Sequence, residues 1–141
     1  MAGRIGGPKT RNGNQWTEAR FRSFIRSQLR AATMRWGPIA TSLKDARVGR
    51  GEYLCAECEQ VVPATIKING RRTKNVHVDH IEPIVDPDVG FVNYDTLIER
   101  MFCEADNLQV LCHECHNKKT DDEKARAKVR RQRLKEEDID D

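Results

Sequence analysis

The spacing of apolar residues predicts two helices in the first third of the chain. The first is expected to begin at Thr17, because a threonine side chain accepts hydrogen bonds from the free N–H groups at a helix N-terminus. Its apolar face is formed by residues at helical spacing, which are Phe21, Phe24, Ile25, Leu29 and Ala32. Gly37–Pro38 ends this helix, and a second one is expected from Pro38 to Val48. Residues 16–50 are therefore predicted to form a helical extension, preceded by a disordered basic arm at residues 1–15.

After residue 50 the pattern changes to short apolar runs that are typical of strands. Residues 61–68 and 71–78 are predicted to be two strands of a hairpin, because the Asn69–Gly70 dipeptide between them is a preferred two-residue turn. A helix is expected at residues 93–104, and a short apolar strand follows at residues 108–111. These elements predict an α+β fold.

The C-terminal part of the chain is predicted to be helical from about Cys112 onward. Thr120–Glu123 has the form of a capping box, which allows a new helical segment to start there. Residues 121–141 contain few apolar positions, so we expect a charged, frayed helix or tail that is solvated. Residues 51–120, between the helical extension and this C-terminal segment, are predicted to form the core domain.

The charges are distributed unevenly over the 141 residues. Residues 1–50 hold 11 Lys and Arg against 2 Asp and Glu, whereas residues 51–120 hold 7 against 12. A basic segment at residues 1–50 followed by an acidic one at residues 51–120 fits an arm that binds a polyanion, joined to a site that needs carboxylates. The alternative is that the basic segment is only solvated. The chain contains neither an apolar run long enough to span a membrane nor a secretory signal, so we expect a cytoplasmic protein without a membrane partner.

The cysteines point to a bound metal. Four of the five form two C-x-x-C pairs that are separated by 53 residues: Cys55, Cys58, Cys112 and Cys115. Two residues between thiolates let both sulfurs turn toward one ion, and two such pairs complete a tetrahedral zinc shell with Zn–S bonds of ~2.3 Å. Disulfides fit poorly with an odd cysteine count and a reducing compartment. We therefore predict a structural Zn²⁺ that joins the start of residues 51–120 to their end. Four unrelated buried cysteines are the alternative, and Cys103 is interpreted as a small core residue.

Motifs between and after the cysteine pairs occur in a specific order. Val78-Asp79-His80-Ile81-Glu82-Pro83 comes first, Asn107-Leu108-Gln109-Val110-Leu111 comes next, and the second cysteine pair runs into His116-Asn117-Lys118-Lys119-Thr120. In this order they resemble the HNH endonucleases with a ββα-metal core, over residues 53–120. The basic stretch with Trp16 and the arginine-rich helix is similar to small bacteriophage-encoded HNH nucleases. The chain departs from the commonest pattern in having a 26-residue connection after His80 instead of an early Gly-Gly loop.

The resemblance implies a role for each residue of these motifs. His80 corresponds to the general base that takes a proton from water, and Asp79 and His116 correspond to ligands of a catalytic divalent cation, which is Mg²⁺, Mn²⁺ or another transition metal. Asn107 corresponds to the residue that orients the base and its loop or reaches the metal. Lys119 is expected to hold a phosphate. Adjacent residues of a regular strand face opposite ways, so Asp79 and His80 serve one site only if the strand ends or bends there.

The remaining predictions concern binding and function. Arg22, Arg26 and Arg30 share one edge of the first helix and are expected to contact DNA phosphates without reading sequence. His77 and His113 are interpreted as structural or surface residues. We expect a metal-dependent DNA endonuclease that nicks DNA or cuts both strands; the alternative is a non-catalytic zinc-containing nucleic-acid-binding module. Expected partners are DNA and either a second copy of the chain, as a homodimer, or phage packaging proteins, in the bacterial host cytoplasm if the chain is phage-encoded.

Overall fold

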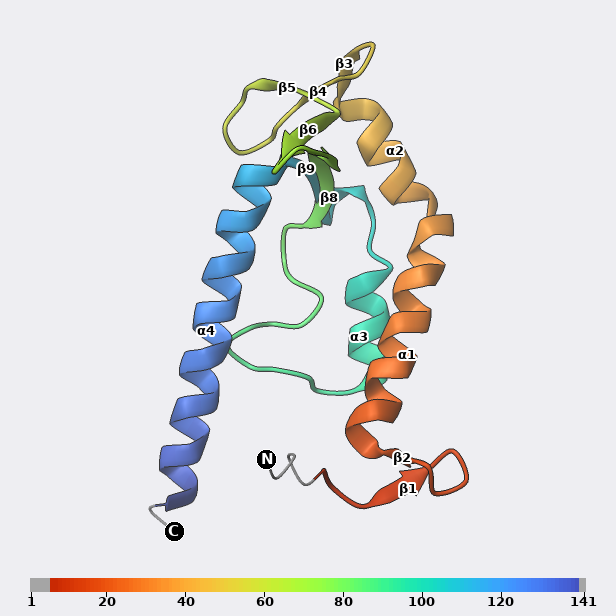
Figure 1. Ribbon diagram of the computed structural model, residues 1–141, viewed down its shortest axis with the longest axis vertical. Coiled ribbons are helices and arrows are strands. Elements are labelled where there is room, and N and C mark those ends of the chain that lie inside the picture. The colour runs from red at the N-terminus through yellow and green to blue at the C-terminus, as the bar shows by residue number, and fades with distance from the viewer. Residues whose placement is uncertain (1–5, 140–141) are drawn as a thin grey trace. The chain divides into compact units, whose positions relative to one another are not determined.

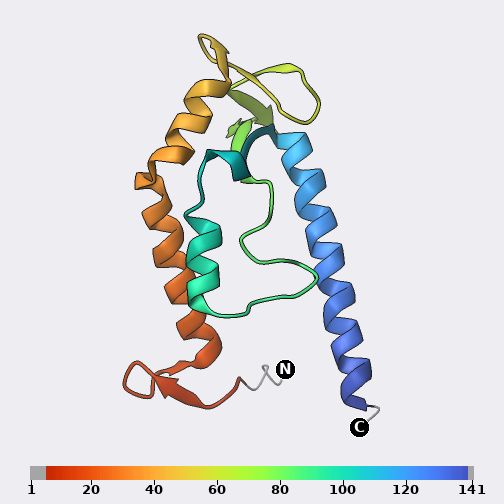
Figure 2. The same ribbon diagram turned by 180° about the vertical axis from the view of Figure 1, so that it is seen from behind.

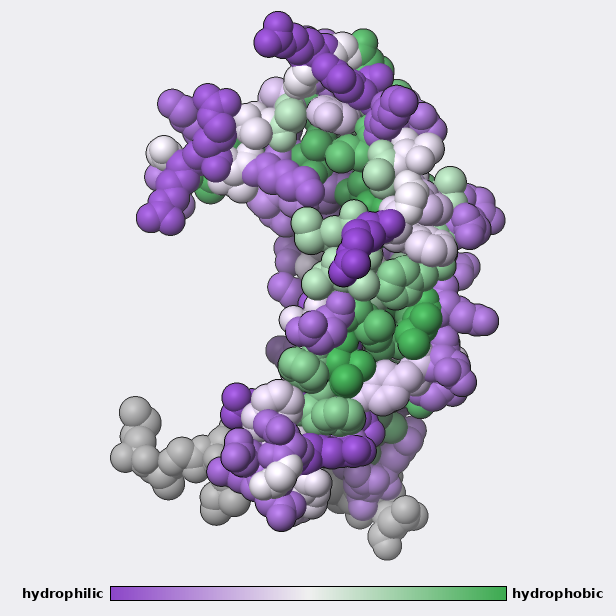
Figure 3. All heavy atoms as spheres, turned by 90° about the vertical axis from the view of Figure 1, so that its right-hand side faces the viewer, coloured by the Kyte–Doolittle hydropathy of each residue, from purple (hydrophilic) through white to green (hydrophobic). Residues whose placement is uncertain are grey.

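A computed structural model describes residues 6–139, with side chains through residue 138, and has a mixed α+β fold (Figure 1). The chain divides into two compact units, Met1–Arg35 and Trp36–Asp141. Among the described residues, no helix combines the length and the apolar character needed to cross a membrane. Large apolar side chains remain on the surface, such as Met34, which is 86% exposed, and Figure 3 shows apolar as well as hydrophilic residues on one face.

The first unit begins with a small hairpin. Strand β1 (Lys9–Arg11) pairs antiparallel with β2 (Trp16–Thr17). The turn between them, Asn12–Asn14, has positive φ at all three residues, and Arg11 Nε lies 2.9 Å from Glu18 Oε2. The prediction of a disordered arm is therefore wrong for the segment that forms β1, because the turn returns the chain to the start of the helix. The first five residues of the predicted arm lie outside the described residues.

Helix α1 (Glu18–Ala32) follows the hairpin and is continued by the short 3-10 helix η1 (Thr33–Arg35). The predicted cap is confirmed, because the Thr17 hydroxyl oxygen accepts a hydrogen bond from the backbone N–H of Arg20 at 3.2 Å. None of the α1 side chains is fully buried.

The second unit contains the remaining elements. In chain order they are α2 (Gly37–Ala46), β3 (Arg47–Gly49), β4 (Glu52–Leu54), β5 (Val61–Pro63), β6 (Thr65–Ile68), β7 (Arg71–Lys74), β8 (Val76–His80), α3 (Tyr94–Met101), η2 (Ala105–Asn107), β9 (Leu108–Cys112) and α4 (His113–Ile139). Strands β3, β4 and β5 form one antiparallel sheet, β6 pairs with β7, and β8 pairs with β9. The predicted helices and the Asn69–Gly70 hairpin are present.

The pair β8–β9 is the centre of the second unit. Helix α4 starts directly after β9, and both α2 and α4 contact the two strands (Figure 1). The buried apolar residues of the described chain come mainly from these elements and α3: Cys55, Val76, Leu97, Met101, Leu108, Val110, Leu111 and Cys112. This small core holds β8, β9 and α4 together in the order strand, strand, helix.

The two strands that the sequence predicts as continuous are each interrupted, the first at Ala64 between β5 and β6 and the second at Asn75 between β7 and β8. Asn75 is the buried residue at this break. It is 5% exposed, its side-chain Nδ2 donates to the carbonyl oxygen of Pro63 at 2.8 Å, and its N–H donates to that of Ala64 at 2.9 Å. Its own carbonyl accepts the N–H of His113 at 2.7 Å, at the start of α4. Asn75 thus connects the β6–β7 hairpin, the β8–β9 pair and the start of α4 through hydrogen bonds, as a buried amide requires.

Helix α4 runs without interruption through the segment where a new start was predicted. Lys119 and Glu123 lie one turn apart with Nζ and Oε1 at 2.9 Å, an interaction that supports a continuous helix. The loop after β8 reaches the middle of α4, as Figure 2 shows from behind. There Asp88 forms an ion pair with Arg126, and Arg130 Nη1 donates to the Pro87 carbonyl at 3.2 Å. The C-terminal segment is thus helical through Ile139 and its side chains at residues 131–138 are exposed, which agrees with the predicted charged, solvated helix.

Candidate functional site

The two cysteine pairs converge on one point, as predicted. The sulfur atoms of Cys55, Cys58, Cys112 and Cys115 all lie within 4.8 Å of one another. A tetrahedral zinc ion with Zn–S bonds of ~2.3 Å requires sulfurs about 3.8 Å apart, so these thiols fit such a shell. Cys112 is the last residue of β9, and Cys115 lies in the first turn of α4. The four cysteines are therefore positioned to bind a metal ion such as zinc at a strand–helix junction.

Backbone hydrogen bonds hold the first cysteine pair against β9. The N–H of Cys112 points at the sulfur of Cys55 at 3.3 Å, a contact that orients a metal-binding thiolate. The N–H of Ala56 donates to the carbonyl of Val110 at 2.9 Å, and that of Glu59 donates to the carbonyl of Cys55 at 3.0 Å. Glu59 has a φ of 59°, in the left-handed region that such a tight turn requires.

The thiols of Cys55 and Cys115 differ strongly in pKa. Burial raises the pKa of Cys55, but backbone N–H donors, first that of Cys112, outweigh it and bring the pKa down to about 6. For Cys115, burial and then the adjacent thiols raise the pKa to about 12. Four thiolates this close need a cation between them, which fits the chemistry of a metal-binding set.

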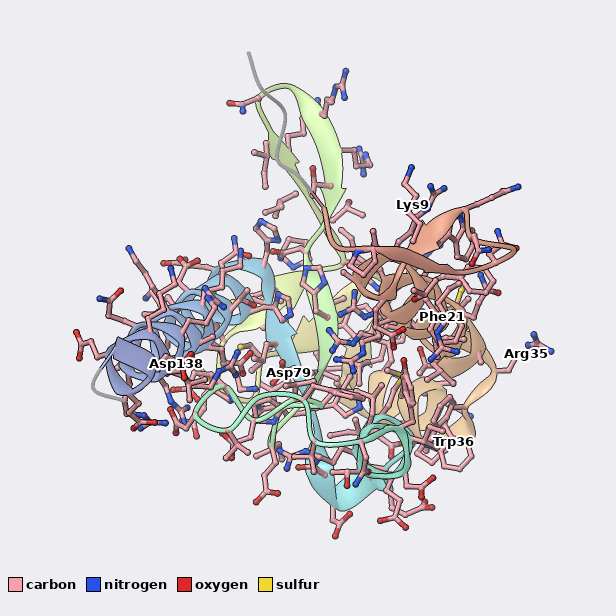
Figure 4. All side chains as sticks on the ribbon, turned by 90° about the horizontal axis from the view of Figure 1, so that it is seen from below. Lys9, Phe21, Arg35, Trp36, Asp79 and Asp138 are labelled. Atoms are coloured by element: carbon pink, nitrogen blue, oxygen red, sulfur yellow. The ribbon has the colours of Figure 1, made fainter. Side chains whose placement is uncertain are left out.

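Asp79 lies on the side of β8 that faces α4 (Figure 4). Its Oδ2 accepts from Lys119 Nζ at 2.8 Å and from Gln109 Nε2, on the paired strand, at 3.1 Å. Lys119 Nζ also forms an ion pair with Glu123 Oε1 at 2.9 Å and donates to the His80 carbonyl at 2.7 Å, so the ammonium lies among three oxygen atoms. Burial by itself lowers the pKa of Lys119, but these carboxylates raise it above its ordinary value.

An open cleft of about 650 Å³ lies beside this ion pair. Its lining includes Gln109 and Lys119, which both contact Asp79, together with Lys118 and the cysteine residues Cys58 and Cys115. The cleft therefore extends from the metal-binding thiols to the Gln109 and Lys119 side chains that contact Asp79, and two lysines border it.

His80 points in the opposite direction from Asp79. Its Nε2 lies 2.9 Å from the carbonyl oxygen of Met101, at the end of α3. The next peptide N–H, that of Ile81, still donates to the carbonyl of Asn107 at 2.9 Å, so the pairing of the two chain segments extends past His80. Since alternate residues of a strand face opposite sides, the regular geometry of β8 separates the two side chains.

Asn107 holds the chain immediately after His80. Its Oδ1 accepts the N–H of Glu82 at 2.8 Å, and its Nδ2 donates to the Glu82 carbonyl at 3.3 Å. The Asn107 side-chain amide therefore makes the two hydrogen bonds to the Glu82 backbone that a neighbouring strand would make, and it fixes the position at which β8 ends. The loop-orienting role that the resemblance implies for Asn107 stays a prediction.

Three histidines gather where β8 meets α4. The ring of His77 stacks on that of His116, with centroids 4.5 Å apart, and its Nε2 lies 3.3 Å from Nδ1 of His113. The Nε2 of His113 is in turn 3.1 Å from Nδ2 of Asn117. Burial, and then the neighbouring His116, lowers the pKa of His77. His77 and His113 thus belong to the surroundings of His116, although no sequence motif points to either.

The predicted ligands of a catalytic cation are not gathered into a ready cluster. Among the described residues, the four cysteines are the only group of three or more His, Cys, Asp or Glu with ligand atoms this close together. Asp79 is occupied by Lys119, and His116 is stacked on His77. The structure brings Asp79, Lys119 and the backbone of His80 together but turns the His80 side chain toward α3.

The predicted phosphate-binding arginines lie in the first unit. Arg22 and Arg30 are exposed and Arg26 is half-buried, at four-residue spacing along α1. The Nε of Arg22 lies 3.6 Å from Oε1 of Glu18, which partly neutralises it.

The chain matches no family model, no curated protein and no solved structure with which it was compared.

Proposed function

We propose that this chain is a metal-dependent DNA endonuclease of the HNH type. The observation that carries the proposal is the hydrogen bond between His80 Nε2 and the Met101 carbonyl, at the end of the first strand of a strand–strand–helix unit formed by β8, β9 and α4. Because Asp79 and His80 leave β8 on opposite sides, the proposal requires the end of this strand to bend when the cation and DNA bind. The motifs Asp79-His80, Asn107 and His116 occupy successive parts of this unit in the order that the resemblance requires.

The hydrogen bond of His80 suits a general base. A carbonyl oxygen can only accept, so Nε2, at 2.9 Å from the Met101 oxygen, carries the proton of the neutral ring. The other ring nitrogen, Nδ1, then has a free lone pair and can take a proton from water.

A divalent cation would neutralise the phosphate and stabilise the leaving 3′ oxygen. Asp79 and His116 are the residues proposed to hold it, and their carboxylate and imidazole groups suit Mg²⁺, Mn²⁺ or a later transition ion. Lys119 provides the positive charge beside Asp79. We therefore expect the cation and the Lys119 ammonium to compete for this carboxylate.

The remaining residues position the chain and the substrate. Asn107 fixes the backbone at Glu82 and so holds the end of β8, where His80 lies. Lys118 and Lys119 border the open cleft and carry the charge that a phosphate needs, and Arg22, Arg26 and Arg30 supply further cations on α1.

The test is plasmid cleavage by the wild type and by His80→Ala, with Mg²⁺, Mn²⁺, Ni²⁺ and Zn²⁺ supplied in turn. Loss of a general base lowers the rate by about 10²–10⁴-fold. Cys103→Ser is the control, since it replaces another half-buried residue of the same unit that lies outside the proposed site, and it should keep most of the activity. Circular dichroism and metal content show that both variants are folded. A His80→Ala variant that cleaves at the wild-type rate would refute the assignment.

The second candidate is a non-catalytic zinc-containing module that binds nucleic acid. The ion pair between Asp79 and Lys119 favours it, because it leaves the carboxylate satisfied without a cation. This function predicts salt-dependent DNA binding but no cleavage with any of the four ions, and a supercoiled plasmid analysed on a gel separates the two.

A further inference from the structure

The β6–β7 hairpin concentrates positive charge within the acidic part of the chain. Between residues 60 and 78 the sequence has no Asp or Glu, and its four cations lie on the two strands: Lys67, Arg71, Arg72 and Lys74. All four are exposed. Within the part of the chain that the structure describes, none of them forms an ion pair.

The register of the hairpin places three of these cations on one face. Lys67 lies directly opposite Arg72, and Thr65 lies opposite Lys74, so these four residues share a side of the ribbon. Arg72 Nη1 donates to the Thr65 hydroxyl at 3.1 Å, which holds the guanidinium over this face. Like charges directly opposite each other destabilise a strand pair. A polyanion bound to this face would remove that cost.

The shape of the hairpin suits a nucleic acid groove. Asn69 and Gly70 both have positive φ, 53° and 79°, which gives a narrow two-residue tip. Among the described strands, β6 and β7 pair only with each other, and Figure 4 shows the ribbon projecting from the rest of the second unit. The DNA major groove is about 12 Å wide and admits a two-stranded ribbon.

The backbone spacing of two of these cations is close to the axial advance of two nucleotide steps. Arg72 and Lys74 are two residues apart on one strand, which is about 6.7 Å at the usual rise. Two nucleotide steps along one DNA strand advance about 6.8 Å. The ribbon is also close in sequence to the proposed chemistry, because Asn75 alone separates β7 from β8, which ends at His80.

We infer that the β6–β7 hairpin is a phosphate-contacting ribbon that holds duplex DNA through Lys67, Arg72 and Lys74. The inference rests on the proposed function, since it assumes that the polyanion is DNA. It gives the second unit a DNA-binding surface of its own, in addition to the arginines of α1. Arg71 lies on the opposite face, with Ile66 and Ile68, and is not part of the contact.

The experiment measures binding of a fluorescent duplex by anisotropy between 50 and 300 mM KCl, with zinc-loaded protein and no other divalent ion. The variant replaces Lys67, Arg72 and Lys74 with Gln together. Removing one phosphate contact lowers the slope of log K against log salt by about 0.9, so the slope of the triple variant should fall by up to ~2.7. Weaker binding should appear at every sequence tested, because phosphates carry no base information.

Two further variants keep the result interpretable. Lys124, Lys128 and Lys135 are exposed on α4, and replacing these three with Gln changes the net charge by the same amount. This control should reduce the slope much less. The double variant Lys67→Arg/Lys74→Arg should bind like the wild type, because the charge is kept.

The outcomes separate the two proposals. A wild type that binds and cleaves DNA, with a hairpin variant that has the same salt slope and affinity as the α4 control, overturns the inference and leaves the nuclease proposal standing. A wild type that binds no duplex overturns both. A selective decrease of slope in the hairpin variant supports the ribbon even if no ion produces cleavage.

Discussion

Replacing Cys112 with serine should unfold much of the second unit. Cys112 is 7% exposed and supplies one of four thiols to the metal-binding cluster. Structural zinc contributes about 10–16 kcal/mol in small zinc domains, so one ligand of four accounts for about 3 kcal/mol. A buried hydroxyl without a partner costs about 1–3 kcal/mol more. The expected loss of about 4–6 kcal/mol is comparable to the whole stability of many domains, which is about 5–15 kcal/mol.

The assay is thermal unfolding followed by circular dichroism, together with elemental analysis of the purified protein. The wild type should hold about one zinc per chain. At about 4 °C or more per kcal/mol for a domain of this size, Cys112→Ser should melt at least ~15 °C lower or lose its cooperative transition. Cys103→Ser is the matched control, because Cys103 is half-buried and lies outside the cluster. A Cys112→Ser protein that keeps its metal, or melts like Cys103→Ser, would refute the reasoning.

Individual contacts give three further predictions. Asn75→Ala leaves the Pro63 carbonyl without its donor and should cost about 1–3 kcal/mol in urea unfolding; a smaller change would show that water replaces the amide. Asn107→Ala should speed hydrogen exchange at the Glu82 amide, and an unchanged exchange rate would contradict its bracing role. Burial and nearby cationic groups lower the pKa of His77, so the folded state binds a proton less readily than the unfolded state. The wild type should therefore lose stability as pH falls through about 6.5, where an exposed histidine titrates. The His77→Gln variant should lose less stability over the same range. If the melting temperatures of the two proteins fell equally with pH, the reasoning would be wrong.

Features encoded within a few residues were predictable from the sequence. The Thr17 cap, the Asn69–Gly70 turn and the two C-x-x-C pairs each depend on local geometry, and each is present in the structure. The helix from about Cys112 onward was predicted, but the capping-box pattern at Thr120 suggested a new start that the structure does not have. That local pattern says nothing about the packing on either side. The break at Asn75 was missed for a related reason, since its partners include residues on α4 and on a strand of another sheet.

The candidate site was predicted in its members but not in its contacts. The motifs name Asp79, His80, Asn107 and His116, yet no local pattern tells that Lys119 occupies Asp79 or that His80 turns toward the carbonyl of Met101. These contacts join residues that are 21 to 40 positions apart in the sequence. They arise from the packing of α3 and α4 on β8. The periodicity of apolar residues predicts these elements but not how they pack against one another. Local spacing also gives the strand alternation, and that alternation explains why Asp79 and His80 diverge.

A metal ion bound by the four cysteines would also act as a reversible cross-link between distant parts of the chain. Cys55 and Cys58 lie before the long connection at residues 81–93, and Cys112 and Cys115 lie after it. A protease that cuts once in this connection would leave two fragments still joined through the metal and the β8–β9 ladder. The nicked protein should migrate as one species on a native column and separate only after a strong chelator is added.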